Sequence, residues 1–74
     1  MTHQRAVSPT AVAMRINRRL RPSGIRIRRA RSETDRMTFG LHSLWAGPQP
    51  IALHVELAAV ARTVGALAFD EVIA

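Results

Sequence analysis

Residues 8–28 read SPTAVAMRINRRLRPSGIRIR and predict a helix that runs directly into a strand. Ser8 followed by Pro9 is a typical helix start, because serine caps free N–H groups and proline suits the first helical position. Apolar residues then recur at helical spacing at Val12, Ala13, Ile16 and Leu20. Pro22 disfavours helical geometry in the residue before it, and Gly24 completes the stop.

The strand that follows begins at Ile25, where apolar residues alternate with arginines through Arg28. Strict alternation is typical of a strand that buries one face. The same period recurs over residues 37–41 and over residues 51–55, which predicts two further strands.

The connections and the second helix are predicted from the residues between these runs. Polar residues 32–35 are interpreted as a turn, and residues 47–50, with two prolines, as a loop. Helical spacing returns over residues 57–64, and Gly65 is placed to end that helix. Residues 69–74 are interpreted as a further helical turn.

These elements predict an α+β fold in the order helix-strand-strand-strand-helix. Short connections favour a three-stranded antiparallel meander with the middle strand central. Both helices are expected on one face of the sheet, because an amphipathic helix has to bury its apolar stripe. That face carries Ile25, Ile27, Phe39, Leu41, Leu53 and Val55. Residues 1–7 are expected to form a disordered N-terminal tail, and residues 8–74 a single α+β domain.

Turns centred on Thr34 and Pro48 would set the pairing of the strands, because short loops constrain register. The open face of the sheet then carries a row formed by Arg26, His42 and His54. Arg29 falls on the core side opposite Phe39, which predicts a bulge or an arginine that reaches past the sheet edge.

Positive charge is concentrated in the first half of the chain. Every basic residue is arginine, and residues 1–36 hold ten arginines against two carboxylates, whereas residues 37–74 carry a net charge of −2. A basic half of this kind attracts phosphates or an acidic protein surface. The candidate nucleic-acid-binding residues are Arg15, Arg18, Arg19, Arg21, Arg26, Arg28 and Arg31. The alternative is a solvated surface encoded by a GC-rich genome, which explains arginine over lysine but not the clustering.

Groups that could perform catalysis are few. The chain has no cysteine, lysine or tyrosine, and its five carboxylates form no evident acid–base pair. Its four glycines are too dispersed to cradle a nucleotide. We therefore predict that the protein is not an enzyme and has no catalytic residue, cofactor or metal.

Two histidines and one tryptophan have competing interpretations. His42 and His54, if they face each other, could bind a metal or titrate together, but two ligands do not complete a site. Exposed histidines without a function are the favoured interpretation. Trp45 could stack on a nucleic-acid base or, with Leu44, form part of a partner patch. A lone tryptophan that covers the edge of a core is the favoured interpretation.

Two segments resemble a family of short proteobacterial proteins. Residues 54–67 read HVELAAVARTVGAL and are similar to that family's closing pattern, approximately HV[DE]LExLARELGVL. Residues 15–20, RINRRL, resemble its opening, whereas residues 45–50 depart from its pattern. The family has no established activity, so the resemblance implies only the fold and a bacterial origin.

The predicted order of elements also resembles the double-stranded RNA-binding domain. That family binds phosphate through a lysine-rich start to its last helix, whereas residues 56–59 here read ELAA. The resemblance is therefore topological and implies no function.

The leading hypothesis is a small bacterial accessory protein, from a mobile element, that binds nucleic acid through non-specific phosphate contacts. The alternative is a phage or mobile-element inhibitor or adaptor, of the anti-defence or anti-CRISPR type, that blocks an acidic or RNA-containing host complex stoichiometrically. A homodimer is a further option, because a core of this size is close to the lower limit for one domain. No secretory signal or membrane-spanning run is evident, so we expect a cytoplasmic protein without a membrane partner.

Overall fold

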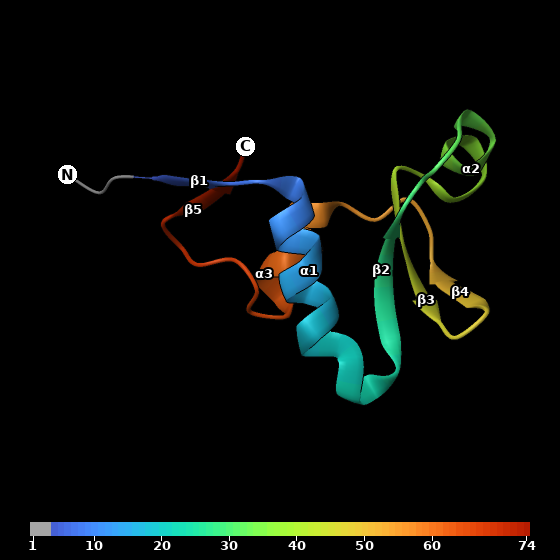
Figure 1. The fold of residues 1–74 in the computed structure, drawn as a ribbon, viewed down its shortest axis with the longest axis horizontal. Coiled ribbons are helices and arrows are strands. Elements are labelled where there is room, and N and C mark those ends of the chain that lie inside the picture. The colour runs from blue at the N-terminus through green and yellow to red at the C-terminus, as the bar shows by residue number, and fades with distance from the viewer. Residues whose placement is uncertain (1–3) are drawn as a thin grey trace.

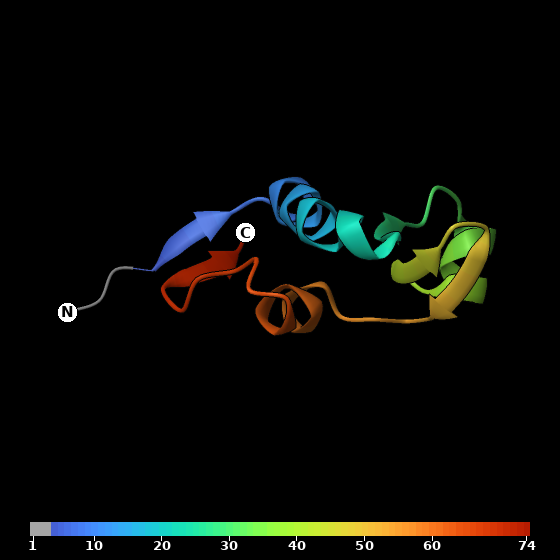
Figure 2. The same ribbon diagram turned by 90° about the horizontal axis from the view of Figure 1, so that it is seen from below.

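The computed structural model describes residues 4–74, whose helices and strands form three groups along the molecule (Figure 1, Figure 2). The elements are β1 (Arg5–Val7), α1 (Pro9–Leu20), the 3-10 helix η1 (Arg21–Ser23), β2 (Ile25–Arg29), α2 (Glu33–Phe39), β3 (His42–Ala46), β4 (Gln49–Ala52), α3 (Leu57–Thr63) and β5 (Glu71–Ile73). β1 and β5 lie at one end, α1 and α3 pack together in the middle, and β2, β3, β4 and α2 lie at the other end. The α+β class is confirmed.

Helix α1 begins and ends where its sequence predicts. The Ser8 side chain accepts a hydrogen bond from the backbone N–H of Ala11 at 3.1 Å, and Pro9 occupies the first helical position. After η1, Gly24 adopts a left-handed conformation with φ +70°, and β2 begins at the next residue. Glycine suits this turn because it has no side chain to oppose a positive φ.

The larger sheet is three-stranded and antiparallel, in the order β2-β3-β4, so the predicted kind of sheet is confirmed. The predicted order helix-strand-strand-strand-helix is not confirmed, because α2 lies between β2 and β3 and because β1 and β5 flank the other elements. A tight turn at Gly47 and Pro48 joins β3 to β4. A register irregularity lies between Leu44 and Trp45, where the β3–β4 pairing shifts by one residue. The loop predicted over residues 47–50 is thus shorter than expected, because its last two residues already belong to β4.

The predicted strand over residues 37–41 is wrong, because residues 33–39 form α2. Ser32 accepts a hydrogen bond from the N–H of Asp35 at 3.1 Å, which caps the helix, and the acidic first turn suits the positive end of the helix dipole. Gly40 ends α2 with φ +88°. A β-carbon there would lie 2.6 Å from the Cα of His54, so the position admits only glycine without rearrangement.

The helical insertion changes the register of the sheet. Ile27 pairs with Leu44 rather than with a residue of the predicted strand, and Arg26 pairs with Trp45 rather than His42. A shift by an odd number of residues exchanges the two faces of a strand. Arg29 pairs with His42 at the end of the sheet and is exposed, so the conflict expected with Phe39 does not arise.

The main core is formed by α1, α3, β2 and the segment that follows α3. Its buried residues are Val12, Ile16, Ile27, Leu57, Ala61, Ala66 and Leu67. Helix α1 packs against β2, whereas α3 packs mainly on α1, so the expected placement of both helices on one face of the sheet is not confirmed (Figure 2). No helix within residues 4–74 combines the length and the apolar composition needed to cross a bilayer.

A second, two-stranded sheet joins the two ends of the described chain. β1 pairs in parallel with β5, with Arg5, Ala6 and Val7 opposite Glu71, Val72 and Ile73. Residues 5–7 thus form a strand rather than part of the disordered tail expected over residues 1–7, of which residues 1–3 lie outside the described residues. The helical turn expected over residues 69–74 is wrong, because β5 occupies this segment.

Candidate nucleic-acid interface

Four of the seven candidate arginines gather at the C-terminal end of α1. Arg18 and Arg19 lie in its last turn, Arg21 begins η1, and Arg26 is the second residue of β2. The tight turn at Gly24 brings the end of the helix and the start of the strand together, and all four arginines are exposed. These four residues are called the arginine surface below.

Two surface cavities flank the end of α1 and divide the arginine surface between them. The first, of about 430 Å³, includes Arg18 and Arg19 in its lining and lies against the segment after α3. The second, of about 310 Å³, includes Arg21 and Arg26. Arg18 follows buried Ile16 by two residues, which places it away from the buried face of the helix. The four arginines therefore line the surface on two sides of the end of α1.

No carboxylate of residues 4–74 lies within 4.0 Å of the arginine surface, although Glu71 lines the same cavity as Arg18 and Arg19. Within residues 4–74, the ion pairs shorter than 4.0 Å all involve either Arg5 or Arg15. Glu33 and Asp35 lie on α2, at the other end of the molecule from β1 and β5 (Figure 1). A helix C-terminus favours cations, which gives Arg18 and Arg19 one structural reason to be there.

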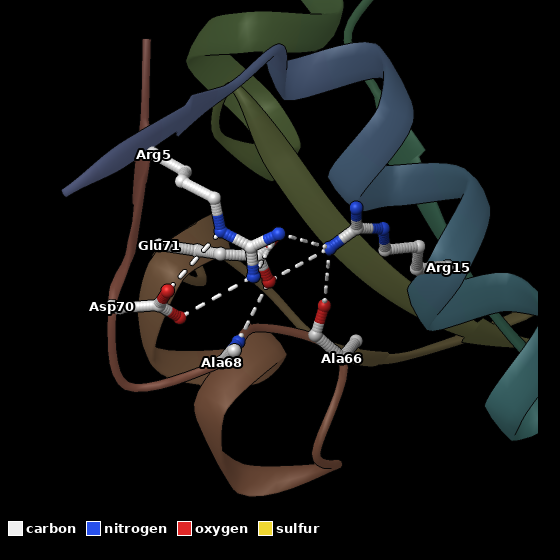
Figure 3. A network of polar contacts seen from close by, with 6 residues as sticks. All are labelled: Arg5, Arg15, Ala66, Ala68, Asp70 and Glu71. Atoms are coloured by element: carbon white, nitrogen blue, oxygen red, sulfur yellow. Dashed lines mark hydrogen bonds and ion pairs between the residues drawn. The ribbon is translucent and has the colours of Figure 1, made fainter. Parts of the chain in front are cut away.

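Arg15, although predicted as a contact residue, belongs to a polar network between α1 and β5 (Figure 3). Its Nη1 donates to both carboxylate oxygens of Glu71, at 2.9 and 3.0 Å, and to the carbonyl of Ala66 at 3.4 Å. Glu71 also accepts from the N–H of Ala68 at 2.9 Å. The charge of Arg15 is therefore offset by the Glu71 side chain, which is only 7% exposed.

The same network holds the carboxyl of Glu71 in its charged form. The Ala68 N–H, followed by the Arg15 guanidinium, lowers the pKa of Glu71 below its ordinary value of 4.5, because both favour the ionised form. Beside it, Arg5 donates to Asp70 through Nε at 3.1 Å and joins β1 to the start of β5 (Figure 3). These contacts join the C-terminal segment to β1 and α1, although the Arg5 side chain is 64% exposed.

Arg28 stacks on Trp45, on the sheet face that does not contact α1. The centre of its guanidinium lies 4.6 Å from the Trp45 ring centroid, and Phe39 meets the same ring edge to face at 5.2 Å. Trp45 is 9% exposed and donates from Nε1 to Ser43 Oγ at 2.8 Å. Trp45 is thus buried against Arg28 and Phe39, outside the main core, which agrees with the favoured interpretation that it covers the edge of a core.

Arg31 lies apart from the other candidates. It follows the far end of β2, in the connection to α2, whereas the arginine surface lies at the near end of that strand (Figure 1). It is exposed. The structure thus brings four of the seven candidates together. Two others, Arg15 and Arg28, contact partners within the protein, and Arg31 lies elsewhere.

The two histidines do not form the predicted exposed pair. His42 is 8% exposed and pairs with Arg29, and burial, followed by the Arg29 charge, lowers the pKa of its imidazole. His54 lies beyond the end of β4, is exposed, and has φ +52°. Within residues 4–74 no group of three or more histidines, cysteines or carboxylates could hold a metal ion.

Comparison with known proteins gives no further guidance: no protein-family model, no curated protein and no solved structure matches this chain. The resemblance to short proteobacterial proteins stays a prediction. The function is therefore argued from the residues themselves.

Proposed function

We propose that the protein binds nucleic acid through non-specific phosphate contacts made by the arginine surface. The observation that carries this proposal is a group of four neighbouring, exposed guanidiniums without a carboxylate within 4.0 Å among residues 4–74. Arginine suits phosphate because its planar group donates paired hydrogen bonds. Contacts to phosphate hold a protein on nucleic acid without recognising the base sequence. This role therefore needs binding residues and no catalytic group.

Of the three remaining candidates, exposed Arg31 lies apart from the surface and the other two have structural roles in this proposal. Arg15 orders the segment after α3 through Glu71, and Arg28 covers Trp45. The surface itself contains Arg18 in the last turn of α1 and Arg21 in η1, and both are exposed. These two are the best positions for a test, because neither has a side-chain hydrogen bond within residues 4–74 that a substitution would remove.

The test is a salt titration of binding to a labelled DNA duplex, followed by fluorescence anisotropy. The logarithm of the binding constant should fall linearly with the logarithm of salt concentration, with a slope of about −0.9 for each phosphate contact. The double variant Arg18→Gln, Arg21→Gln should make this slope less steep by about 2 and weaken binding to unrelated sequences alike.

The matched control is the double variant Arg29→Gln, Arg36→Gln, which removes the same charge from exposed positions outside the arginine surface. It should leave the slope nearly unchanged. An equal loss in both double variants would show diffuse attraction and refute the assigned surface. If the wild-type protein at micromolar concentration binds neither duplex nor single-stranded nucleic acid at low salt, the proposal is refuted.

A second candidate function, a protein-binding inhibitor or adaptor, is favoured by a different observation. An apolar surface cavity of about 410 Å³ lies between the sheet and α3, and its lining includes Leu20, Ile25, Leu44 and Val60. Ile51, also in this lining, is 51% exposed, and Phe69 elsewhere is 90% exposed. Large exposed apolar side chains are typical of protein interaction sites.

Affinity purification from a bacterial host lysate, with and without nuclease, separates the two functions. Stoichiometric retention of one protein after nuclease treatment, lost on Ile51→Ser, would favour the second function. Loss of all retained material on nuclease treatment would favour the first. Either target suits a bacterial accessory protein of the cytoplasm, carried by a mobile element, and this setting is part of the proposal.

A further inference from the structure

A separate surface cavity of about 400 Å³ lies between the start of α3 and the end of the β2–β3 pair. Its volume is within the range of small-molecule pockets, roughly 300–1,000 Å³. Most of its lining is apolar and includes Leu41, Val55 and Leu57, and its polar side chains are Arg29, His42 and Glu56. No residue of the arginine surface lines it.

His42 is the feature that points to a ligand. Its residue is only 8% exposed, yet its imidazole makes no hydrogen bond within residues 4–74. No side-chain nitrogen or oxygen of that part of the chain is both sealed from solvent and without a partner, so the ring nitrogens of His42, which lines this cavity, keep contact with solvent. A ligand bound in the cavity could replace the water that contacts these nitrogens.

The charges around His42 select the kind of group that could bind. Arg29 pairs with His42 across β2 and β3, and its charge acts on the ring. A cation beside an imidazole that can donate a hydrogen bond suits a carboxylate. Glu56 opposes an anion, but it also lines the neighbouring apolar cavity and is exposed, so its carboxylate is not confined to this site.

We propose that this cavity binds a monocarboxylate with an apolar tail, of the medium-chain fatty acid type. Its carboxylate would lie between Arg29 and His42, and its tail against Leu41, Val55 and Leu57. Binding of a carboxylate in this cavity is independent of the proposed binding of nucleic acid, because the cavity shares no residue with the two cavities at the arginine surface.

The test is an NMR titration with octanoate, octanol and octylamine, three ligands with the same tail and different head groups. Octanoate should produce saturable shifts at His42, Leu41, Val55 and Leu57. Octanol should bind at least about tenfold more weakly, because it lacks the charge-assisted contact. Bound octanoate should also raise the pKa of His42, since a negative charge beside the ring favours its protonated form.

Variants make the assignment of the head group specific. Arg29→Gln should weaken octanoate about tenfold and leave octanol unchanged, whereas Arg36→Gln, an exposed arginine outside the cavity, should change neither. Glu56→Gln should tighten octanoate. Equal binding of octanoate and octanol, or octanoate shifts confined to other residues, would overturn the proposal, whatever the outcome of the nucleic-acid titration.

Discussion

Asn17→Ala tests how α1 is joined to the sheet. The Asn17 Oδ1 accepts a hydrogen bond from the backbone N–H of Ile27 at 2.7 Å, and its Nδ2 donates to the carbonyl of Ile27 at 3.3 Å. β2 is an edge strand of the sheet, and these two groups point away from β3 toward the helix. The Asn17 side chain therefore makes the two hydrogen bonds with Ile27 that a neighbouring strand would otherwise make on this edge of β2.

The expected loss follows from what the substitution leaves behind. Ile27 is 4% exposed, so its N–H and carbonyl would lose their partners in a place with little access to water. Each unsatisfied buried group costs about 1–3 kcal/mol, and we expect a total loss of about 2–4 kcal/mol. A chain of 74 residues has a stability of about 4–11 kcal/mol at typical values per residue, so this loss is a large share. The midpoint of thermal unfolding should fall by about 10–30 °C.

Urea unfolding, followed by circular dichroism and by the fluorescence of Trp45, measures this loss. The midpoint should decrease with little change in the slope m, because the native fold is retained. Arg18→Ala is the matched control: it changes the next residue of the same helix, which is exposed, and should stay within about 0.5 kcal/mol of wild type. If Asn17→Ala is equally mild, the side chain does not hold β2 and the reasoning is refuted.

The remaining predictions concern Glu71 and two glycines. The lowered pKa of Glu71 means that its contribution to stability is present above the ordinary carboxyl value of 4.5 and is lost as the pH falls through the lowered value. Glu71→Gln should therefore flatten the decline of the unfolding temperature with acid, whereas an unchanged decline would assign it to other carboxylates. Gly40→Ala should cost at least about 2 kcal/mol, since it combines φ +88° with a β-carbon 2.6 Å from the Cα of His54. Gly24→Ala has φ +70° and no neighbour within 4 Å, so chemical unfolding should show a loss of only about 1 kcal/mol, and equal losses for the two glycines would contradict the steric argument.

The elements predicted correctly are those whose signals are local. The start of α1 is set by Ser8 and Pro9, and its end by the turn at Gly24, all within one stretch of chain. The alternation that begins at Ile25 and the helical spacing from Leu57 likewise depend on neighbours along the sequence. Each of these signals acts within a few residues, and here no competing local pattern overlaps with it.

Helix α2 was predicted as a strand because two patterns overlap in its sequence. Met37, Phe39 and Leu41 alternate with polar residues, which is typical of a strand. Ser32 followed three residues later by Asp35 is also typical of a capped helix start, and the structure contains that cap. The cap satisfies backbone donors, while Phe39 still reaches Trp45 from the helix, so the apolar residue gains a partner without a strand.

The pairing of β1 with β5 had no local signal at all. Arg5 lies opposite Glu71, and residues that far apart in the chain are brought together by tertiary contacts: the packing of α1 on α3 and the contacts of Arg15 and Arg5. The same distance explains why Arg15 was counted among the contact residues. Its partner Glu71 belongs to a segment that the sequence placed in a helical turn.

The stability of the fold explains only some of the arginines in the arginine surface. The negative end of the α1 dipole accounts for a cation in its last turn, where Arg18 and Arg19 lie. It does not account for Arg26, which lies on a strand and lines a cavity with Arg21 and no carboxylate. Like charges held together oppose folding, and the chain has carboxylates elsewhere, as the partners of Arg5 and Arg15 show. If the proposed function is right, a phosphate-bearing partner that binds only the folded state would offset this repulsion by mass action and so stabilise the folded chain.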